Sequence, residues 1–345
     1  MKTINSPNGK IVIIIFSFIV SLYFLSQDSH PFLSCKSENN TVKKDSIVPW
    51  QVPEITSIAD NAEGAEIKLG KSIFVDTYRY IGPDVKDVSK RYARTNMDCQ
   101  NCHLKAGTLK YVFGLIGTYT RYPEMDTRSG KVINIQERIN NCLMRSMNGK
   151  AMPEDSKEMK ALVAYIKWLS IYVPKGTRTE EQGIPKIQLL SRAADTSAGR
   201  MVFLGKCMTC HSEDGEGALN IPGNIDVPAD SMKGYDYPPV YGKFSYNEGA
   251  GMYKLLTAAS FIYSKMPYHY SELTVEESYD VAAFINSKSR PVFKDAGKDY
   301  PDLKLKPIDS PFPPYADSFT QLQHKYGPYG PMLKEGEKSI MIKPE

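Results

Sequence analysis

The sequence predicts a mainly α-helical protein built from two similar domains in tandem, and three observations support this prediction. The chain has 345 residues, enough for about two domains at roughly 100 to 200 residues each. The same five-residue pattern, Cys-x-x-Cys-His, occurs at 99–103 and at 207–211. A segment with apolar residues at helical spacing follows each copy, at 158–170 and at 275–287.

The composition excludes several classes of protein. Lys and Arg number 43 against 39 Asp and Glu, and the resulting net charge of +4 is spread along the chain. This distribution does not support a nucleic-acid-binding protein. Hydrophobic residues make up 41% and charged residues 24%, which excludes both a disordered protein and a protein with many membrane spans.

The N-terminus has the features of an export signal. Lys2 and Lys10 precede an uncharged, mostly apolar run at 11–25, and a polar segment at 26–30 follows. Fifteen helical residues rise only about 22 Å, whereas a bilayer core is about 30 Å thick. The run therefore favours a signal peptide and a periplasmic protein, with an uncleaved anchor as the alternative.

A second form of attachment is suggested by Cys35. The segment FLSC at 32–35 resembles a bacterial lipoprotein cleavage site, and a polar tether at 37–46 would suit a lipid-anchored protein. A free thiol is the alternative for this cysteine. The expected leader or anchor, together with its tether, occupies 1–45.

The two pentapeptides, CQNCH and CMTCH, match the attachment pattern of c-type haem. Two thiols three positions apart can bind the two vinyl groups of one porphyrin, and the adjacent imidazole then lies under the iron. A zinc site or a redox-active Cys-x-x-Cys is the alternative, but two independent copies favour haem. We expect two covalent haem c groups, with anchors and proximal ligands at Cys99, Cys102, His103, Cys207, Cys210 and His211.

Each motif lies within a longer repeat. A Gly-x-x-x-Phe pattern precedes it, at 70–74 and at 199–203. The downstream segments EMKALVAYIKWLS (158–170) and VEESYDVAAFINS (275–287) are also alike. This order resembles two cytochrome c domains in tandem.

The repeat sets the expected domain boundaries. The first cytochrome c domain spans 46–175, and the second spans 185–292. A polar, turn-rich linker at 176–184 separates them. The last 55 residues contain 9 Pro and several aromatic residues, which predicts an extended but ordered C-terminal wrap at 293–345.

The sixth ligand of the second haem iron is expected from the triplet Lys265-Met266-Pro267. Met266 lies 55 residues after His211, and a thioether before a proline is a typical distal ligand of a cytochrome c. Lys265 competes with it as a neutral amine, which requires a lowered pKa. The sequence leaves open an exchange between the two donors, and a methionine in the core is a further alternative.

Two residues compete for the sixth position of the first haem iron. Met152, 49 residues after His103, precedes a proline like Met266. Cys142, 39 residues after His103, is the one thiol of the folded body that the porphyrins do not use. Spacing alone does not decide whether Met152 or Cys142 binds the first haem iron.

Positive charge clusters around Cys142. Arg138 precedes it by four residues and Arg145 follows by three, spacings that bring side chains together on a helix. Arg128 lies fourteen residues upstream. Positive charge favours the thiolate, which is both a nucleophile and a metal ligand, and it attracts small dianions.

Four segments together resemble the dihaem thiosulfate dehydrogenases, which are relatives of the cytochrome subunit of the sulfur-oxidising multienzyme system. They are RYARTNMDCQNCHL (91–104), INNCLMRSMNGKAM (139–152), KMP (265–267) and QHKYGPYGPM (323–332). The resemblance covers about residues 50 to 335.

The resemblance implies site residues and a reaction. It makes Cys142 the distal ligand of the first haem, places Arg128 and Arg138 in the substrate site, and leaves electron relay to Lys265 and Met266. The implied reaction is 2 thiosulfate ⇌ tetrathionate + 2 electrons, with a periplasmic c-type cytochrome as partner. We expect Cys142 to leave the iron, bind one sulfane sulfur and be attacked by a second thiosulfate.

Two other functions fit the same sequence. One is a dihaem cytochrome that only transfers electrons, which predicts Met152 on the first iron. The other is a subunit of a sulfur-oxidising complex that conjugates thiosulfate to a carrier protein, and such a subunit would need a partner cytochrome.

Overall fold

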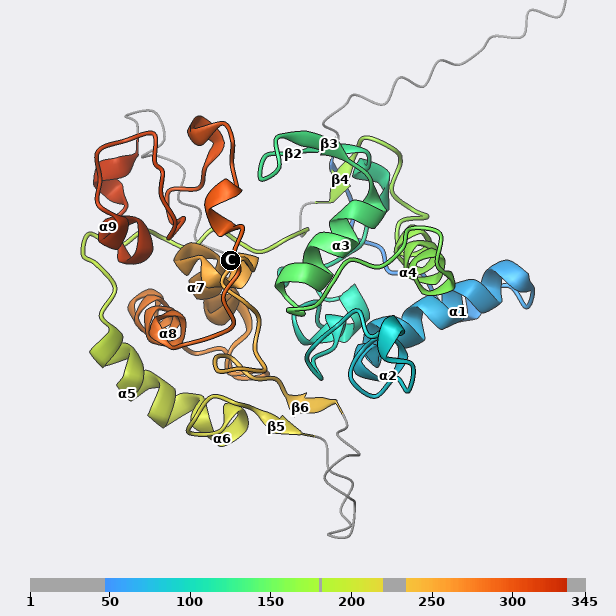
Figure 1. Cartoon of the computed structure of the whole chain (residues 1–345), viewed down its shortest axis with the longest axis horizontal. Helices are drawn as coiled ribbons and strands as arrows, with labels where there is room; N and C mark the ends of the chain where they lie inside the picture. Colours follow the sequence, from blue (N-terminus) through green and yellow to red (C-terminus); the bar gives the residue numbers. More distant parts are fainter. Residues whose placement is uncertain (1–46, 180–181, 220–233, 334–345) are drawn as a thin grey trace, which may run out of the picture. The chain divides into compact units, whose positions relative to one another are not determined.

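Two groups of helices follow one another along the chain and are shown in Figure 1. The computed structural model describes residues 47–179, 182–219 and 234–333. The first group contains α1 (Ala62–Val75), α2 (Thr77–Ile81), α3 (Ile135–Arg145) and α4 (Lys157–Trp168). The second contains α5 (Thr196–Lys206), α6 (Met208–His211), α7 (Leu255–Lys265) and α8 (Val275–Ser287), and α9 (Gln321–Tyr326) follows in the wrap.

Short 3-10 helices and two-stranded sheets fill the connections. The 3-10 helices are Ile55–Ser57, Val88–Lys90, Cys99–Asn101, Lys105–Gly107, Tyr119–Arg121, Gly251–Tyr253, Ala296–Lys298, Leu303–Leu305 and Gly330–Met332. The parallel pair is β1 (Ile47–Val48) with β4 (Arg178–Thr179). The antiparallel pairs are β2 (Glu124–Asp126) with β3 (Lys131–Ile133), and β5 (Ala218–Leu219) with β6 (Tyr235–Tyr237).

Gly70 allows α1 to pack closely against α4. A β-carbon on Gly70 would lie 1.9 Å from the carbonyl oxygen of Ala161 in α4, far inside van der Waals contact. One turn later, Phe74 is only 3% exposed. The Gly-x-x-x-Phe pattern thus combines a close helix crossing with a buried aromatic ring.

The second group repeats this arrangement with α5 and α8. A β-carbon on Gly199 would lie 1.8 Å from the carbonyl oxygen of Asp280 in α8. Phe203 is fully buried, and its ring centroid lies 5.4 Å from that of Phe284. The repeat seen in the sequence is therefore a repeat of packing as well.

The two helices predicted downstream of the motifs are confirmed. The prediction at 158–170 corresponds to α4, and the prediction at 275–287 has the bounds of α8. Helix α8 begins with a capping box, in which Thr274 accepts from the Glu277 backbone and the Glu277 side chain accepts from the Thr274 backbone. Local signals were enough to set its start.

The segment predicted as a linker packs against the first domain. Its strand β4 pairs with β1, with Ile47 opposite Arg178. Further along, the Gly183 carbonyl accepts a hydrogen bond of 2.9 Å from the Phe113 backbone N–H. The boundaries at 175 and 185 stay predictions, but this connection contributes to the structure of the first domain.

Two hydrophobic cores, one in each helix group, meet at the segment before α7. Tyr246 and Tyr253 belong to the first core, although they follow the second Cys-x-x-Cys-His motif in the chain. Met252 packs against both cores. The two domains therefore share a packed boundary.

The C-terminal wrap is ordered over the part that the structure describes, up to residue 333. Phe312 packs against the first core. Tyr329 belongs to the second core, and Ile308 packs against it. The wrap is not wholly extended, because α9 forms one short helix within it. Its aromatic residues provide the apolar contacts that hold it in place.

The predicted leader, its tether and Cys35 lie outside the described residues. Within residues 47–179, 182–219 and 234–333, no helix combines the length and the apolar character needed to cross a membrane.

Replacing Gly199 by Ala tests the helix crossing. The added methyl group must displace α8, so we expect the free energy of unfolding to fall by about 1–3 kcal/mol. The measurement is urea unfolding of the haem-loaded protein, followed by circular dichroism.

Gly205→Ala is the matched control, since it lies in the same helix and a β-carbon there would meet nothing within 4 Å. Alanine has the higher helix propensity, so this variant should be as stable as the wild type or up to about 1 kcal/mol more stable. Equal stabilities for the two variants would contradict the close-packing explanation.

Candidate active site

A cavity of about 490 Å³ lies beside the CQNCH motif in the first domain. Cys99, Cys102 and His103 line it together with Cys142 from α3. Much of the remaining lining is apolar, and includes Phe74, Met97, Leu115, Leu143, Leu162, Ile166 and Met252. The cavity thus unites the haem motif with the predicted reactive thiol.

A backbone carbonyl orients the imidazole of each motif. Nδ1 of His103 lies 2.6 Å from the Phe113 carbonyl oxygen, and Nδ1 of His211 lies 2.8 Å from that of Pro238. A carbonyl only accepts hydrogen bonds, so Nδ1 carries the proton and Nε2 is available to a metal. A histidine that binds a metal through one ring nitrogen typically donates such a hydrogen bond from the other.

Burial disfavours ionisation of the two motif cysteines in the cavity. It raises the pKa of Cys99 to about 12 and that of Cys102 to about 11. The Thr77 hydroxyl, 3.3 Å from the Cys99 Sγ, opposes this effect only partly. Burial therefore favours the neutral thiol form of both side chains.

Cys142 has the opposite character. Burial would raise its pKa, but Arg138, His103 and Arg128 together lower it to about 6. Arg138 contacts the thiol directly, since its Nη1 lies 3.1 Å from the Cys142 Sγ. The two residues are one turn apart on α3, as their spacing predicted. The positive charge of Arg138 and Arg128 thus favours the thiolate form of this side chain.

Arg145 differs from the sequence expectation. Its Nη1 and Nη2 donate hydrogen bonds of 2.8 and 2.7 Å to the two carboxylate oxygens of Asp299. Its guanidinium also lies 4.2 Å from the centroid of the Phe293 ring. Arg145 therefore pairs with Asp299, which lies 154 residues away in the chain. Its spacing from Cys142 had predicted a position beside the thiol.

Met152, the rival of Cys142, lies in the first hydrophobic core and is 2% exposed. The Asn140 side chain fixes its backbone on both sides, with hydrogen bonds of 2.9 Å to its carbonyl and 2.8 Å from its N–H. Met152 is absent from the cavity lining, whereas Cys142 is part of it.

The cavity has a polar end that the sequence did not indicate. Arg121, Arg178, Thr179 and Gln182 line it there. Nε of Arg121 and Oγ1 of Thr179 are buried and have no hydrogen-bond partner in the described part of the chain. Glu124 lies 3.8 Å from both Arg121 Nε and Arg178 Nη2, which is ion-pair distance but too long for a hydrogen bond. Buried atoms without a hydrogen bond are costly, and the carboxylates of a haem would supply the missing acceptors. The residues present therefore fit a haem at both its apolar and its acidic edges.

The donors predicted for the second haem lie at the end of α7. Lys265 is the last residue of this helix, and Met266 follows it and packs, partly buried, against the second core. Burial lowers the pKa of His211, opposed by its hydrogen bond to Pro238. Among the described residues, no hydrogen bond joins either donor to His211.

Sequence reasoning also missed Tyr122, Thr179 and Asp299. Tyr122 lines the cavity, and burial raises its pKa against the effect of Arg138. Thr179 and Asp299 reach the first domain from distant parts of the chain. No local pattern marks them, because their roles depend on tertiary contacts.

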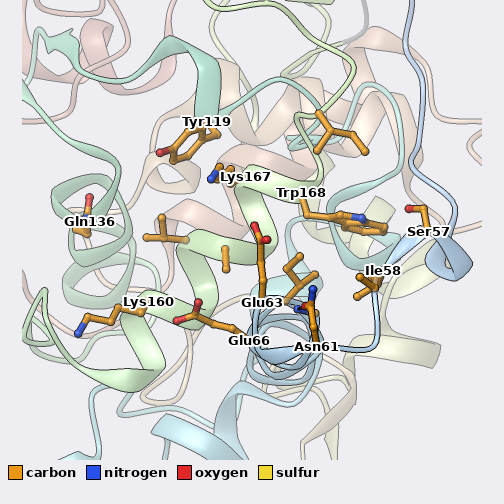
Figure 2. A pocket seen from close by; sticks show the side chains of 16 residues that line it. Ser57, Ile58, Asn61, Glu63, Glu66, Tyr119, Gln136, Lys160, Lys167 and Trp168 are labelled. Atoms are coloured by element: carbon orange, nitrogen blue, oxygen red, sulfur yellow. Dashed lines mark hydrogen bonds between the residues drawn. The ribbon is translucent and has the colours of Figure 1, made fainter.

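A second hollow, of about 590 Å³, lies over α1 and α4. Figure 2 shows Glu63 and Glu66 from α1 with Lys160, Lys167 and Trp168 from α4 around it. None of the predicted site residues lines this hollow, whereas Arg138, Cys142 and the first haem motif line the cavity described above.

Comparison with known families agrees with the two-domain structure. The chain matches the SoxA/TsdA cytochrome c domain over residues 89–174 and the cytochrome c domain over residues 196–289. Each match contains one Cys-x-x-Cys-His motif. The chain is thus a tandem of two cytochrome c domains that carries two covalent haem c groups.

Individual relatives extend the similarity across most of the chain. A thiosulfate dehydrogenase of Psychrobacter arcticus is 34% identical over 253 residues, which are 73% of this chain and 72% of the relative. One of Allochromatium vinosum is 33% identical over 257 residues, or 73% of this chain and 88% of the relative.

A solved structure shares this fold. It is the as-isolated thiosulfate dehydrogenase TsdBA from Marichromatium purpuratum, with a TM-score of 0.63 and 28% identity over 71% of this chain. This chain covers 50% of that longer one. The identity and coverage of the relatives, together with the shared fold, show that the chain belongs to the thiosulfate dehydrogenase family.

Proposed function

We propose that this chain joins two thiosulfate ions into one tetrathionate ion, and catalyses the reverse reaction, while exchanging two electrons with a cytochrome. The observation that carries the proposal is the contact of 3.1 Å between Arg138 Nη1 and Cys142 Sγ. This pair lies in the cavity that His103 and the motif cysteines also line. The relatives named thiosulfate dehydrogenase support the same chemistry.

The described residues suggest how each haem is held. In the first domain Cys99, Cys102 and His103 would bind the haem, with Cys142 as the distal ligand. In the second domain Cys207, Cys210 and His211 would bind it, with Met266 or Lys265 as the distal ligand. When bound, the haems supply storage and transfer of single electrons. Two such groups match a reaction that releases two electrons.

The arginines address the main electrostatic obstacle, which is the repulsion between two thiosulfate dianions. Two opposite unit charges about 4 Å apart attract each other by about 4 kcal/mol at an effective dielectric constant near 20, before the cost of desolvation is subtracted. Arg138 contacts the thiol directly, and Arg128 acts on the same sulfur at longer range. Both guanidinium groups can therefore lower the repulsion where the new bond forms.

The proposed steps balance in atoms and electrons. First, the Cys142 Sγ bonds to the sulfane sulfur of one thiosulfate, and two electrons leave to the acceptor. The side chain is then a cysteine S-thiosulfonate. A second thiosulfate next attacks that sulfane sulfur, which forms the central S–S bond of tetrathionate and releases the Cys142 thiolate. A low pKa suits this thiolate, because it is the leaving group of the second step.

The position of Met152 argues against a protein that only carries electrons. Such a protein needs Met152 on the first iron, but this side chain packs in the core and its backbone is held by Asn140. A subunit that loads a carrier protein would be inactive alone. Thiosulfate oxidation by the isolated chain with an artificial acceptor separates that function from ours.

We further propose that the protein works in the periplasm and exchanges electrons with a c-type cytochrome there. The apolar run at 11–25 and its flanking lysines support export. An uncleaved leader or a lipid on Cys35 would tether it to the membrane.

Replacing Cys142 by Ser removes the proposed nucleophile. We expect turnover to fall by about a thousandfold or more, while both haems stay attached because their anchors are unchanged. Steady-state kinetics and the mass of the intact haem-loaded chain provide the two measurements.

Met152→Leu is the control for this variant, since it conserves volume in the core. It should keep its activity and the ferric spectrum of the wild type. A changed spectrum in Met152→Leu, with normal turnover in Cys142→Ser, would favour the passive electron carrier.

Replacing Arg138 by Gln removes the charge closest to the thiol. We expect the KM for thiosulfate to rise about tenfold, the effect of losing about 1.4 kcal/mol of binding. Lys131→Gln, an exposed change of the same charge on β3, should leave KM unchanged. Equal KM values for both variants would show that Arg138 does not face the substrate.

Replacing Arg121 by Gln tests the polar end of the cavity. If Arg121 neutralises a haem carboxylate, its loss favours the ferric state, and the reduction potential of the first haem should fall by tens of millivolts. A hydrogen bond to a charged group is worth about 1.5–3 kcal/mol. Spectroelectrochemical titration measures this shift, with Lys131→Gln as the control. An unchanged potential would place the carboxylates elsewhere.

A further inference from the structure

Asp299, in the C-terminal wrap, lies between two arginines of the first domain. It accepts the two hydrogen bonds from Arg145 described above, and its Oδ2 lies 3.8 Å from Arg128 Nε. The side chains of Arg145, Asp299 and Arg128 are 10, 16 and 20% exposed. This is a largely buried network, in which geometry is set more strictly than at the surface.

Arg128 is held by its backbone as well as by its side chain. The Tyr300 N–H donates a hydrogen bond of 2.7 Å to the Arg128 carbonyl oxygen. At the other end of the residue, Arg128 Nη1 donates one of 3.0 Å to the Gly249 carbonyl oxygen. Arg145 Nη1 donates to the same carbonyl at 3.1 Å. Neighbouring residues of the wrap thus fix both the main chain and the guanidinium of Arg128.

The turn between β2 and β3, which carries Arg128, is shaped to receive the wrap. Gly130 in this turn has a φ of +69°, and a β-carbon there would lie 2.7 Å from Pro301 Cγ. Tyr300 is 6% exposed and has a φ of +63°, a left-handed conformation that is costly for a residue other than glycine. Packing holds this strained residue in place, so the wrap has one defined register on the hairpin.

We propose that Asp299 is a positioning residue, which holds the Arg128 guanidinium in place for thiosulfate and engages the charge of Arg145. Without the carboxylate, the Arg128 guanidinium would lose its acidic partner, and the buried Arg145 would compete for the Gly249 carbonyl. This inference rests on the proposed function, because that function gives Arg128 its role toward thiosulfate.

The pair Asp299→Asn and Asp295→Asn tests the inference in the haem-loaded enzyme. Asp295 belongs to the same wrap, but its side chain is 60% exposed and pairs with Lys298 at 2.7 Å. We expect the KM for thiosulfate to rise about tenfold in Asp299→Asn, with a smaller change in kcat, and to stay constant in Asp295→Asn. Equal KM values in the two variants would overturn the inference.

A double-mutant cycle separates positioning from general damage. If Asp299 acts through Arg128, then Arg128→Gln combined with Asp299→Asn should have the same KM as Arg128→Gln alone. If each substitution instead raised the KM independently, so that the two factors multiplied, Asp299 would affect thiosulfate binding by a route other than Arg128. Absence of any thiosulfate or tetrathionate activity in the wild type would instead refute the proposed function, so the two failures are distinguishable.

Asp299→Asn could also fail to fold, because it leaves the buried Arg145 charge without a partner. A second comparison covers that case, between Arg145→Met and the double variant Arg145→Met/Asp299→Asn. In Arg145→Met, Arg128 is the arginine that still pairs with Asp299. We therefore expect a higher KM for thiosulfate in the double variant than in Arg145→Met. An unchanged KM would again overturn the inference.

Discussion

Cys142, the thiol that we propose as the nucleophile, lies in a largely apolar cavity, and the proposed chemistry depends on how its negative charge is stabilised. Burial alone raises the pKa of a thiol, as it does for Cys99 and Cys102 in the same cavity. Cys142 differs because Arg138, one helical turn earlier, lies 3.1 Å from its sulfur. Arg138, together with His103 and Arg128, thus gives Cys142 a lower pKa than Cys99 and Cys102.

The imidazole of His103 connects this cavity to the second domain. Its Nδ1 donates to the Phe113 carbonyl, and the Phe113 ring stacks on Phe261 at a centroid distance of 5.8 Å. Phe261 belongs to α7, the helix that ends at Lys265 and continues into Met266. A chain of direct contacts therefore runs from the proximal histidine of one motif to the distal donors expected for the other. Electrons shared between two haems require such close packing of their domains.

The parts of the fold that follow from the sequence are those that local rules decide. The spacing of Cys99, Cys102 and His103 defines a haem motif, and the apolar period with its capping box defines α8. The Arg138 contact also follows from a spacing of four on a helix. Arg145 did not follow its spacing, because Asp299, 154 residues away, forms a bidentate ion pair with it. Propensity and spacing say nothing about such distant partners.

The same reasoning explains why the active site is not a property of the first cytochrome domain alone. Thr179 reaches the cavity from the connection between the domains, and Met252 from the segment before α7. Asp299 adds the wrap, which lies still further along the chain. Each of these residues is separated from the haem motif by more than a helix, so each contact forms only when the whole chain has folded. Closure of the cavity around Cys142 is therefore a consequence of tertiary assembly, whereas the Arg138 charge beside the thiol needs only α3.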